Sequence, residues 1–308
     1  AVKQFGAMHD LNVNLTGGGQ KATFRISAGY KHQSGTIIGQ KFQQFTTRMA
    51  LDYNVSDRIR FLTNFALTYT NNDKNYSDLL SIAQNQAPNM AIYRQDGDGN
   101  DTGEYFLMNP TAPNRNTTPY DGFYSSYDLS DIYKLGNPVA IAREAWRDEK
   151  TYRISPEFSI DYYLLGKDDE HTQLNYTGMV YLDIFSKNEP KYMPGSLSTN
   201  GGTNENYNRS QVYDYNSLGF TTRHTLVFNP HFNNKDLYAT MLGRWEMTTG
   251  NNNSQTVISY NLPGGVLSPT VDTNLDNMST SNGQWRSMSM TYSGHFSYKS
   301  RYSFDFPI

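Results

Sequence analysis

Strict alternation of apolar and polar residues is the feature that most constrains how this chain can fold. In the segment HDLNVNLTGGGQKATFRISAGYKHQSG, residues 9–35, apolar side chains occupy every second position on both sides of a glycine triplet at 17–19. A period of two puts successive side chains on opposite faces of a β-strand. The segment therefore predicts two strands joined by a tight turn, with one apolar and one polar face.

The same pattern recurs along the chain and predicts about ten strands. Many of these strands are about twice the 5–6 residues that are usual in globular proteins. Strands that cross a bilayer need about 9–11 residues and often continue beyond it. Further apolar rows occur at residues 47–53, 59–69, 154–164, 174–184, 220–228, 245–247 and 288–296, and a last strand begins near Arg301.

The connections between these strands alternate between short and long. Short polar turns are expected at residues 17–19, 54–58, 166–171, 229–236 and 298–301, and longer connections at 35–41, 71–150, 186–210 and 250–284. The segment 71–150 far exceeds an ordinary loop. Outer-membrane barrels have short periplasmic turns and long extracellular loops. The pattern thus predicts an all-β fold, an antiparallel up-and-down transmembrane β-barrel with its apolar row toward lipid.

Composition excludes several other classes of protein. The chain has 24 Tyr and 16 Phe, although disordered chains are poor in aromatic residues. The absence of cysteine excludes disulfides and thiolate metal sites. A net charge of −3 without a basic stripe argues against a nucleic-acid partner. No apolar run of about 18 residues and no leader peptide occur, so we expect no transmembrane helix. The chain is then either soluble or a piece of something larger.

Motifs of catalysis and metal binding are weak, and we expect no enzyme. The six histidines are scattered, and neither a nucleophile elbow nor a phosphate loop occurs. Asp96, Asp98 and Asn100 have the spacing of a calcium loop. However, Asp101 replaces the glycine that such a loop requires, and Leu107 stands where its bidentate glutamate belongs. An acidic surface turn is the simpler interpretation, and the set predicts no firm cofactor.

Aromatic residues in the longest connection are the candidate binding residues. Their faces suit stacking on sugar rings or packing on peptide side chains, although they could equally fold the loop on itself. Residues 79–88 predict a short helix that Pro88 ends. The candidates for substrate binding or for contact with a lid are Tyr93, Tyr105, Phe106, Tyr120, Phe123, Tyr124, Tyr127, Tyr133 and Trp146.

Four segments carry a resemblance to a known family, in the same order as in that family. HDLNVNLTGGGQKATFRISAGYKHQSGTI resembles the opening of the barrel in SusC/RagA-like TonB-dependent outer-membrane transporters of the Bacteroidetes. MALDYNVSDRIRFLTNFALTYT is similar to the next hairpin. NPVAIAREAWRDEKTYRISPEFSIDYYL is similar to the return from the large loop, and YSGHFSYKSRYSFDF to a later hairpin. The ending DFPI departs from the pattern, because Pro307 cannot donate to a sheet ladder.

The resemblance implies a role in TonB-dependent import across the cell outer membrane. The substrate would be an oligosaccharide or an oligopeptide. A SusD-like surface lipoprotein would cover the barrel, TonB–ExbB–ExbD would supply energy through a plug, and outer-membrane lipid would surround the wall. Family barrels have about 22 strands. The expected domain is therefore residues 1–308 as a partial barrel with a large extracellular loop at about 71–150, without the plug and N-terminal domains.

Two other classes of function stay open at this point. A passive outer-membrane porin would share the strand pattern but lack a plug. A soluble all-β glycan-binding protein would fold without detergent.

Overall fold

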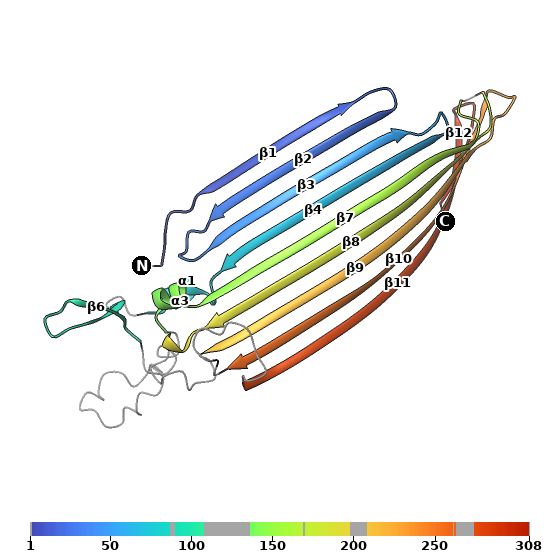
Figure 1. Ribbon diagram of the computed structural model, residues 1–308. Coiled ribbons are helices and arrows are strands. Elements are labelled where there is room, and N and C mark those ends of the chain that lie inside the picture. Colours follow the sequence, from blue (N-terminus) through green and yellow to red (C-terminus); the bar gives the residue numbers. More distant parts are fainter. Residues whose placement is uncertain are drawn as a thin grey trace.

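The computed structural model describes residues 2–86, 90–107, 136–168, 170–197, 208–260, 262 and 274–307. Ten strands form one antiparallel sheet in which each strand lies beside its neighbours in the chain (Figure 1). This arrangement confirms the predicted all-β, up-and-down fold. Strands β1 and β12 form the two edges. The strands are β1 Met8–Gly18, β2 Ala22–Ser34, β3 Lys41–Asn54, β4 Ile59–Lys74, β7 Trp146–Leu165, β8 Gln173–Met193, β9 Arg209–Asn229, β10 Leu237–Tyr260, β11 Asn274–Tyr298 and β12 Tyr302–Pro307.

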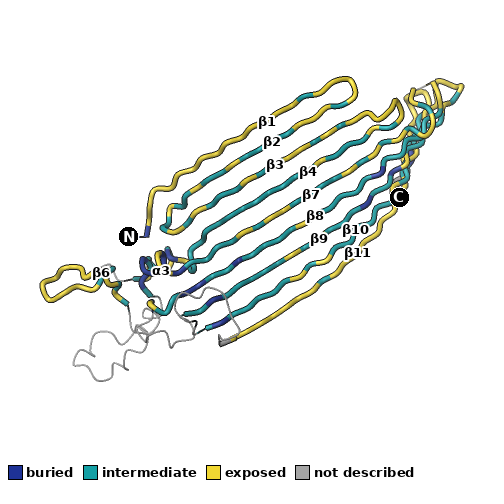
Figure 2. Tube along the Cα trace, viewed as in Figure 1, coloured by how far each residue is buried: buried dark blue, intermediate teal, exposed yellow. Residues whose placement is uncertain are grey.

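The strand register gathers the apolar rows on one face of the sheet. Residues paired across an antiparallel ladder present their side chains on the same face. Ile26 pairs with Met49, and Met49 pairs with Phe65. Farther along the sheet, Ile154 pairs with Ile184. Many large apolar side chains of this face are exposed, and 46% of Met49 is uncovered. Figure 2 shows exposed residues along the strands of the sheet, above all on β1. A wide exposed apolar surface of this kind marks contact with lipid or with another protein.

The first hairpin shows why its turn contains glycine. A Cβ atom on Gly18 would lie 2.6 Å from the carbonyl oxygen of Ala22 and 2.7 Å from the Cα atom of Thr23. Only a residue without a side chain allows the two strands to turn back this closely.

The strands extend beyond the segments that show alternation. Strand β10 continues to Tyr260 and β11 begins at Asn274, although the sequence predicts a connection from 250 to 284. Likewise, β8 continues to Met193. The alternation of apolar and polar residues stops before the strands end, and the hydrogen-bonded pairing of the strands continues through polar residues. The largest connection correspondingly runs from residue 75 to residue 145.

A small apolar core lies at the end of the sheet where the longer connections are. It packs helix α1 (Leu79–Gln84) and helix α3 (Pro138–Glu144) against the short helix η1 (Gly195–Leu197). Helix α1 confirms the helix predicted within residues 79–88. The side chain of Asp78 caps its N-terminus by accepting a hydrogen bond from the backbone N–H of Ser81. We call α1, α3 and η1 the loop platform.

A two-stranded hairpin extends from the same end of the sheet (Figure 1). It consists of β5 (Tyr93–Gln95) and β6 (Asp101–Tyr105). Across the ranges that the structure describes, no helix is long and apolar enough to cross a membrane.

Candidate functional site

Two aromatic rows mark the limits of the apolar face. Tyr69 and Tyr152, on neighbouring strands, have ring centroids 4.8 Å apart near the long-loop end, and we call this pair the upper aromatic row. Tyr162 lies on the same face of β7 near the short-turn end, ten residues from Tyr152. Ten residues span about 34 Å of strand. At the usual tilt of about 40°, this corresponds to about 25 Å along the membrane normal, the height of the apolar band in outer-membrane barrels.

Polar residues replace the apolar ones beyond the upper row. One step past Tyr152 on the same face, Lys150 pairs with Asn188 and Asn188 pairs with Asp214. The sheet therefore leaves the apolar band at this level. Residues of β7 before Tyr152 and of β8 after Ser186 lie outside the band, on the side of the loop platform.

The opposite face of the sheet carries paired charges. Arg153 donates to both carboxylate oxygens of Asp183, each at 2.9 Å, and Asn64 donates to Glu157 at 3.2 Å. Arg60 pairs with Asp52 in the same way, and its Nε lies 2.8 Å from Asp52 Oδ1. Charges can occupy this face because it can meet water, so it is the face that a barrel turns toward its lumen.

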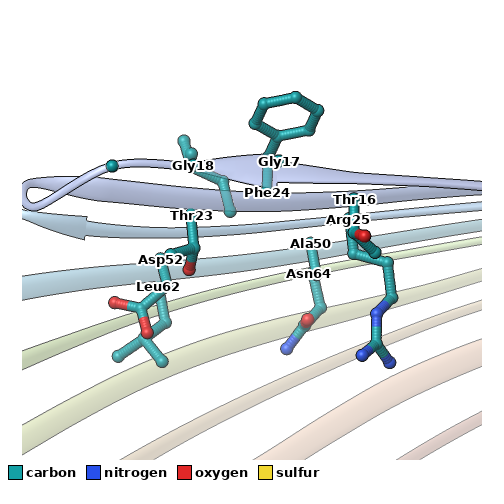
Figure 3. Close-up of a pocket in the computed structure, with 12 residues that line it drawn as sticks. Thr16, Gly17, Gly18, Thr23, Phe24, Arg25, Ala50, Asp52, Leu62 and Asn64 are labelled. Atoms are coloured by element: carbon teal, nitrogen blue, oxygen red, sulfur yellow. The ribbon is translucent and has the colours of Figure 1, made fainter.

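Figure 3 shows the contrast between the two faces near the first turn. Arg25, Asp52 and Asn64 lie on one side of the sheet, whereas Phe24 lies on the other. An open hollow of about 570 Å³ lies here beside Gly18. It faces widely to solvent and contains no convergent set of polar groups, so we do not regard it as a binding site.

Five alternating charges form a continuous network on the polar face above the upper aromatic row. Glu149 accepts from Lys74 at 2.9 Å and from Lys187 at 2.7 Å. Lys187 also lies 2.6 Å from Glu189 Oε2, and Arg147 Nε donates to Glu189 Oε1 at 2.5 Å. We call these residues, Lys74, Arg147, Glu149, Lys187 and Glu189, the loop-end charge cluster. It joins three neighbouring strands.

The two carboxylates of this cluster remain ionised. Burial by itself raises the pKa of Glu149, but hydrogen bonds from Lys187 and Lys74 outweigh that effect and lower the pKa overall. In Glu189 burial likewise raises the pKa, and hydrogen bonds from Lys187 and Arg147 lower it further than burial raises it. For Lys187, burial lowers the pKa and the two glutamates raise it, so that the net shift is upward. The ionised form of each of these three side chains is thus favoured by the opposite charges beside it.

Four of the aromatic residues predicted as binding residues lie within the described ranges. The rings of Tyr93 and Tyr105 stack with centroids 5.4 Å apart across the β5–β6 hairpin, and Arg143 of α3 donates to the Tyr93 hydroxyl at 3.0 Å. Tyr105 also packs on the apolar core. These two rings join the hairpin to the loop platform, whereas Phe106 is 40% exposed.

Trp146 lies at the first position of strand β7 rather than in a loop. Its ring centroid is 6.2 Å from that of Tyr192 on β8. The other five candidates, Tyr120, Phe123, Tyr124, Tyr127 and Tyr133, lie outside the described residues. Of the four described candidates, Tyr93 and Tyr105 lie together at the hairpin, whereas Trp146 packs separately against Tyr192.

The acidic turn that resembles a calcium loop closes on itself. One carboxylate oxygen of Asp96 accepts from the backbone N–H of Asp98 at 3.0 Å and of Asn100 at 2.8 Å. These hydrogen bonds lower the pKa of Asp96, and the bond from the backbone N–H of Asn100 has the largest effect. Within the described ranges, no group of three or more acidic or histidine side chains is placed to hold a metal ion.

The sequence interpretation missed the loop-end charge cluster, although a signal for it is present. In the segment KNEPKYM, residues 187–193, Lys187, Glu189 and Lys191 occur at every second position. A period of two with alternating charge indicates a strand with one charged face. The sequence interpretation places this segment in the connection 186–210 because the apolar row of its strand ends at Ile184.

Comparisons with known proteins agree with this geometry. The TonB-dependent receptor P39 of Formosa agariphila is 26% identical over 152 residues, which make up 49% of this chain and 12% of that receptor. No protein-family model matches the chain.

Solved structures of RagAB share the fold. One, described as a peptide transporter, matches 97% of this chain with a TM-score of 0.63 and 10% identity. A second, a peptide importer in the "closed-closed" state, matches the whole chain with a TM-score of 0.64 and 11% identity. The chain spans 31% and 32% of those two chains. Together, the sequence match and the shared fold confirm the resemblance to RagA-like TonB-dependent receptors, with ten consecutive strands of such a barrel wall present in this chain.

Proposed function

We propose that this chain is part of a transporter that imports oligosaccharides or oligopeptides across the outer membrane. In this proposal, residues 1–308 contribute barrel wall and loops, and a plug domain couples the barrel to TonB–ExbB–ExbD. The observation that carries the proposal is the division of one sheet into an exposed apolar face of bilayer height and an ion-paired polar face. The names of the similar proteins, a receptor and a peptide transporter, support import and give no support to an enzyme.

A SusD-like surface lipoprotein is the proposed partner at the loop end. Loops on a rigid scaffold commonly carry function. The loop platform gives the largest loop a packed base, and the β5–β6 hairpin extends from it with most of its residues exposed. Such a surface could dock a lid, and the loop aromatics would supply contact area at small cost in side-chain entropy.

The test of import uses the full-length transporter in cells that grow on its cognate nutrient. We expect replacement of Phe123, Tyr124 and Tyr127 by alanine to weaken uptake, since one stacked ring contributes about 1–3 kcal/mol in stacking interactions of this kind. Heat-modifiable gel mobility should stay normal because none of the three residues belongs to a strand that the structure describes. A matched control is Phe5→Ala, which removes an exposed aromatic ring outside the strands.

A deletion gives the stronger version of this test. Removing residues 95–127 should abolish co-purification of the lipoprotein, uptake, or both. Normal growth together with normal co-purification would contradict the role proposed for the loop. Recovery of well-folded protein in buffer without detergent would contradict membrane residence, and uptake that is independent of TonB would favour a passive porin.

A further inference from the structure

Lys191, near the loop end of β8, forms no ion pair with a carboxylate within the described ranges. The residues described around it form several ion pairs, but none of these pairs includes Lys191. Its Nζ instead lies 5.6 Å from the centre of the Tyr76 ring. Tyr76 packs against the apolar core, so Lys191 lies where the loop platform meets the polar face.

Two arginines flank Lys191 on the neighbouring strands. Arg147 of β7 is paired directly with Lys191, and Arg209 of β9 is paired with Met193, two residues farther along β8. All three side chains belong to the polar face. Like charges placed opposite each other destabilise a sheet. Burial lowers the pKa of Lys191, repulsion from Arg147 and Arg209 lowers it further, and attraction by Glu189 offsets only part of this shift.

The nearby acids are already engaged with other cations. Glu189 pairs with Arg147 and Lys187, and Asp276 lies 3.2 Å from Arg209. Across this part of the described face, five cations meet three carboxylates and leave an excess of positive charge. The cations are Lys74, Arg147, Lys187, Lys191 and Arg209, and the carboxylates are Glu149, Glu189 and Asp276.

We propose that Lys191, Arg147 and Arg209 form a binding site for a carboxylate group of the imported solute. An anion among the three cations would relieve their repulsion and accept charge-assisted hydrogen bonds. The site lies above the aromatic row that limits the apolar band, on the lumenal face. The rings of Tyr76 and Tyr213 lie beside Lys191 and Lys187 and offer flat surfaces for the uncharged part of a solute.

This site deepens the proposed import function by naming the chemistry of the solute. A carboxylate could belong to an acidic peptide or to a uronic acid in an oligosaccharide. The lumenal position of the site favours a solute that passes through the barrel.

The experiment measures binding to the purified full-length transporter in detergent by calorimetry. The acidic probes are capped pentaglutamate and trigalacturonate, and the neutral counterparts are capped pentaglutamine and maltotriose. We expect at least one acidic probe to bind and its neutral counterpart to bind more weakly. Lys191→Gln should weaken the acidic probe about tenfold or more, the loss expected for one charge-assisted hydrogen bond.

Lys150→Gln is the matched control. Lys150 lies on β7, three residues from Arg147 but on the opposite face, and is exposed. The Lys150→Gln substitution removes the same charge at a similar height and should leave the affinity for the acidic probe nearly unchanged. If neither acidic probe binds, or if both variants weaken binding equally, the proposal is overturned.

Chemical protection gives a second measurement that requires no variant. A bound acidic probe should protect Lys191 from an amine-acylating reagent more than it protects Lys150, as read by mass spectrometry. Equal protection would also overturn the site. Uptake by cells is measured separately, so binding without TonB-dependent uptake would refute the import function alone, and uptake without selective binding would refute this site alone.

Discussion

Phe65 offers a sharp test of which face of the sheet meets lipid. It lies on β4 midway between Phe61 and Tyr69, and its ladder partners on the same face are Met49 and Pro156. The neighbouring residue Asn64 pairs with Glu157, the midpoint between the two aromatic limits of β7. Both residues therefore lie near the centre of the apolar band, one residue apart and on opposite faces.

An arginine at these two positions should have very different effects. At the bilayer midplane, an arginine that faces lipid costs about 2–4 kcal/mol of folding free energy. Phe65→Arg should thus lower the folding equilibrium constant by about 30-fold to 700-fold, at about 1.4 kcal/mol per factor of ten. Asn64→Arg instead places its guanidinium beside Glu157, to which Asn64 already donates at 3.2 Å. Its expected cost is about 0–1 kcal/mol, since the new pair is partly exposed.

The assay is equilibrium unfolding of the full-length transporter in lipid vesicles by guanidinium chloride. The folded fraction is read from heat-modifiable gel mobility, and the two variants are compared with the parent protein. Equal destabilisation by both variants, or a larger loss for Asn64→Arg, would refute the assignment of faces.

Three further predictions concern topology and charge. Asn100→Cys in the β5–β6 turn should react with an impermeant maleimide on whole cells, whereas Asp57→Cys in the β3–β4 turn should react only after permeabilisation; the reverse pattern would invert the orientation. Glu189→Gln removes the carboxylate that Arg147 and Lys187 share, and it should destabilise the full-length protein by about 1–3 kcal/mol in the same unfolding assay. The control is Glu104→Gln, which removes an exposed ion pair with Arg94 and should change stability by less than about 0.5 kcal/mol. A hydrogen bond to Asp168 raises the pKa of His171, and the same bond lowers the pKa of Asp168. The pair should therefore stabilise its turn fully between the ordinary pKa values of 3.8 and 6.5, and this contribution should be lost as pH rises through the raised pKa of His171 or falls through the lowered pKa of Asp168. Asp168→Asn should return the pKa of His171, measured by NMR of labelled histidine, toward 6.5.

The sheet could be predicted from the sequence because alternation is a local signal. Ile26, Met49 and Phe65 each lie in an alternating row, and the short turns fix how those rows align across the ladder. Strand ends were less predictable. Residues 251–260 of β10 contain a run of asparagine, which has low strand propensity, yet they pair with β11 up to Tyr260. The cross-strand ladder decides their structure.

The charge cluster could not be predicted in the same way. Lys74, Glu149 and Lys187 are separated by 75 and 38 residues in the chain, and only the register of three strands brings them together. The helix predicted within residues 79–88 depends on local sequence and is confirmed by α1, whereas its predicted stop at Pro88 lies outside the described residues. The packing of α1 against α3 could not be predicted, since α3 follows more than 50 residues later.

The sequential order of the strands also has a kinetic consequence. Most ladders in the sheet close a turn or loop of modest length, which favours rapid pairing of neighbours. The ladder between β4 and β7 is different, because residues 75–145 separate the two strands. Compared with the four-residue turn between β3 and β4, this closure costs about 2.5 kcal/mol more in chain entropy. Packing of α1 against α3 shortens the open segment before the strands meet. If this contact forms before the strands pair, truncations within the loop platform should slow assembly of the wall, as measured by the rate of refolding into lipid vesicles.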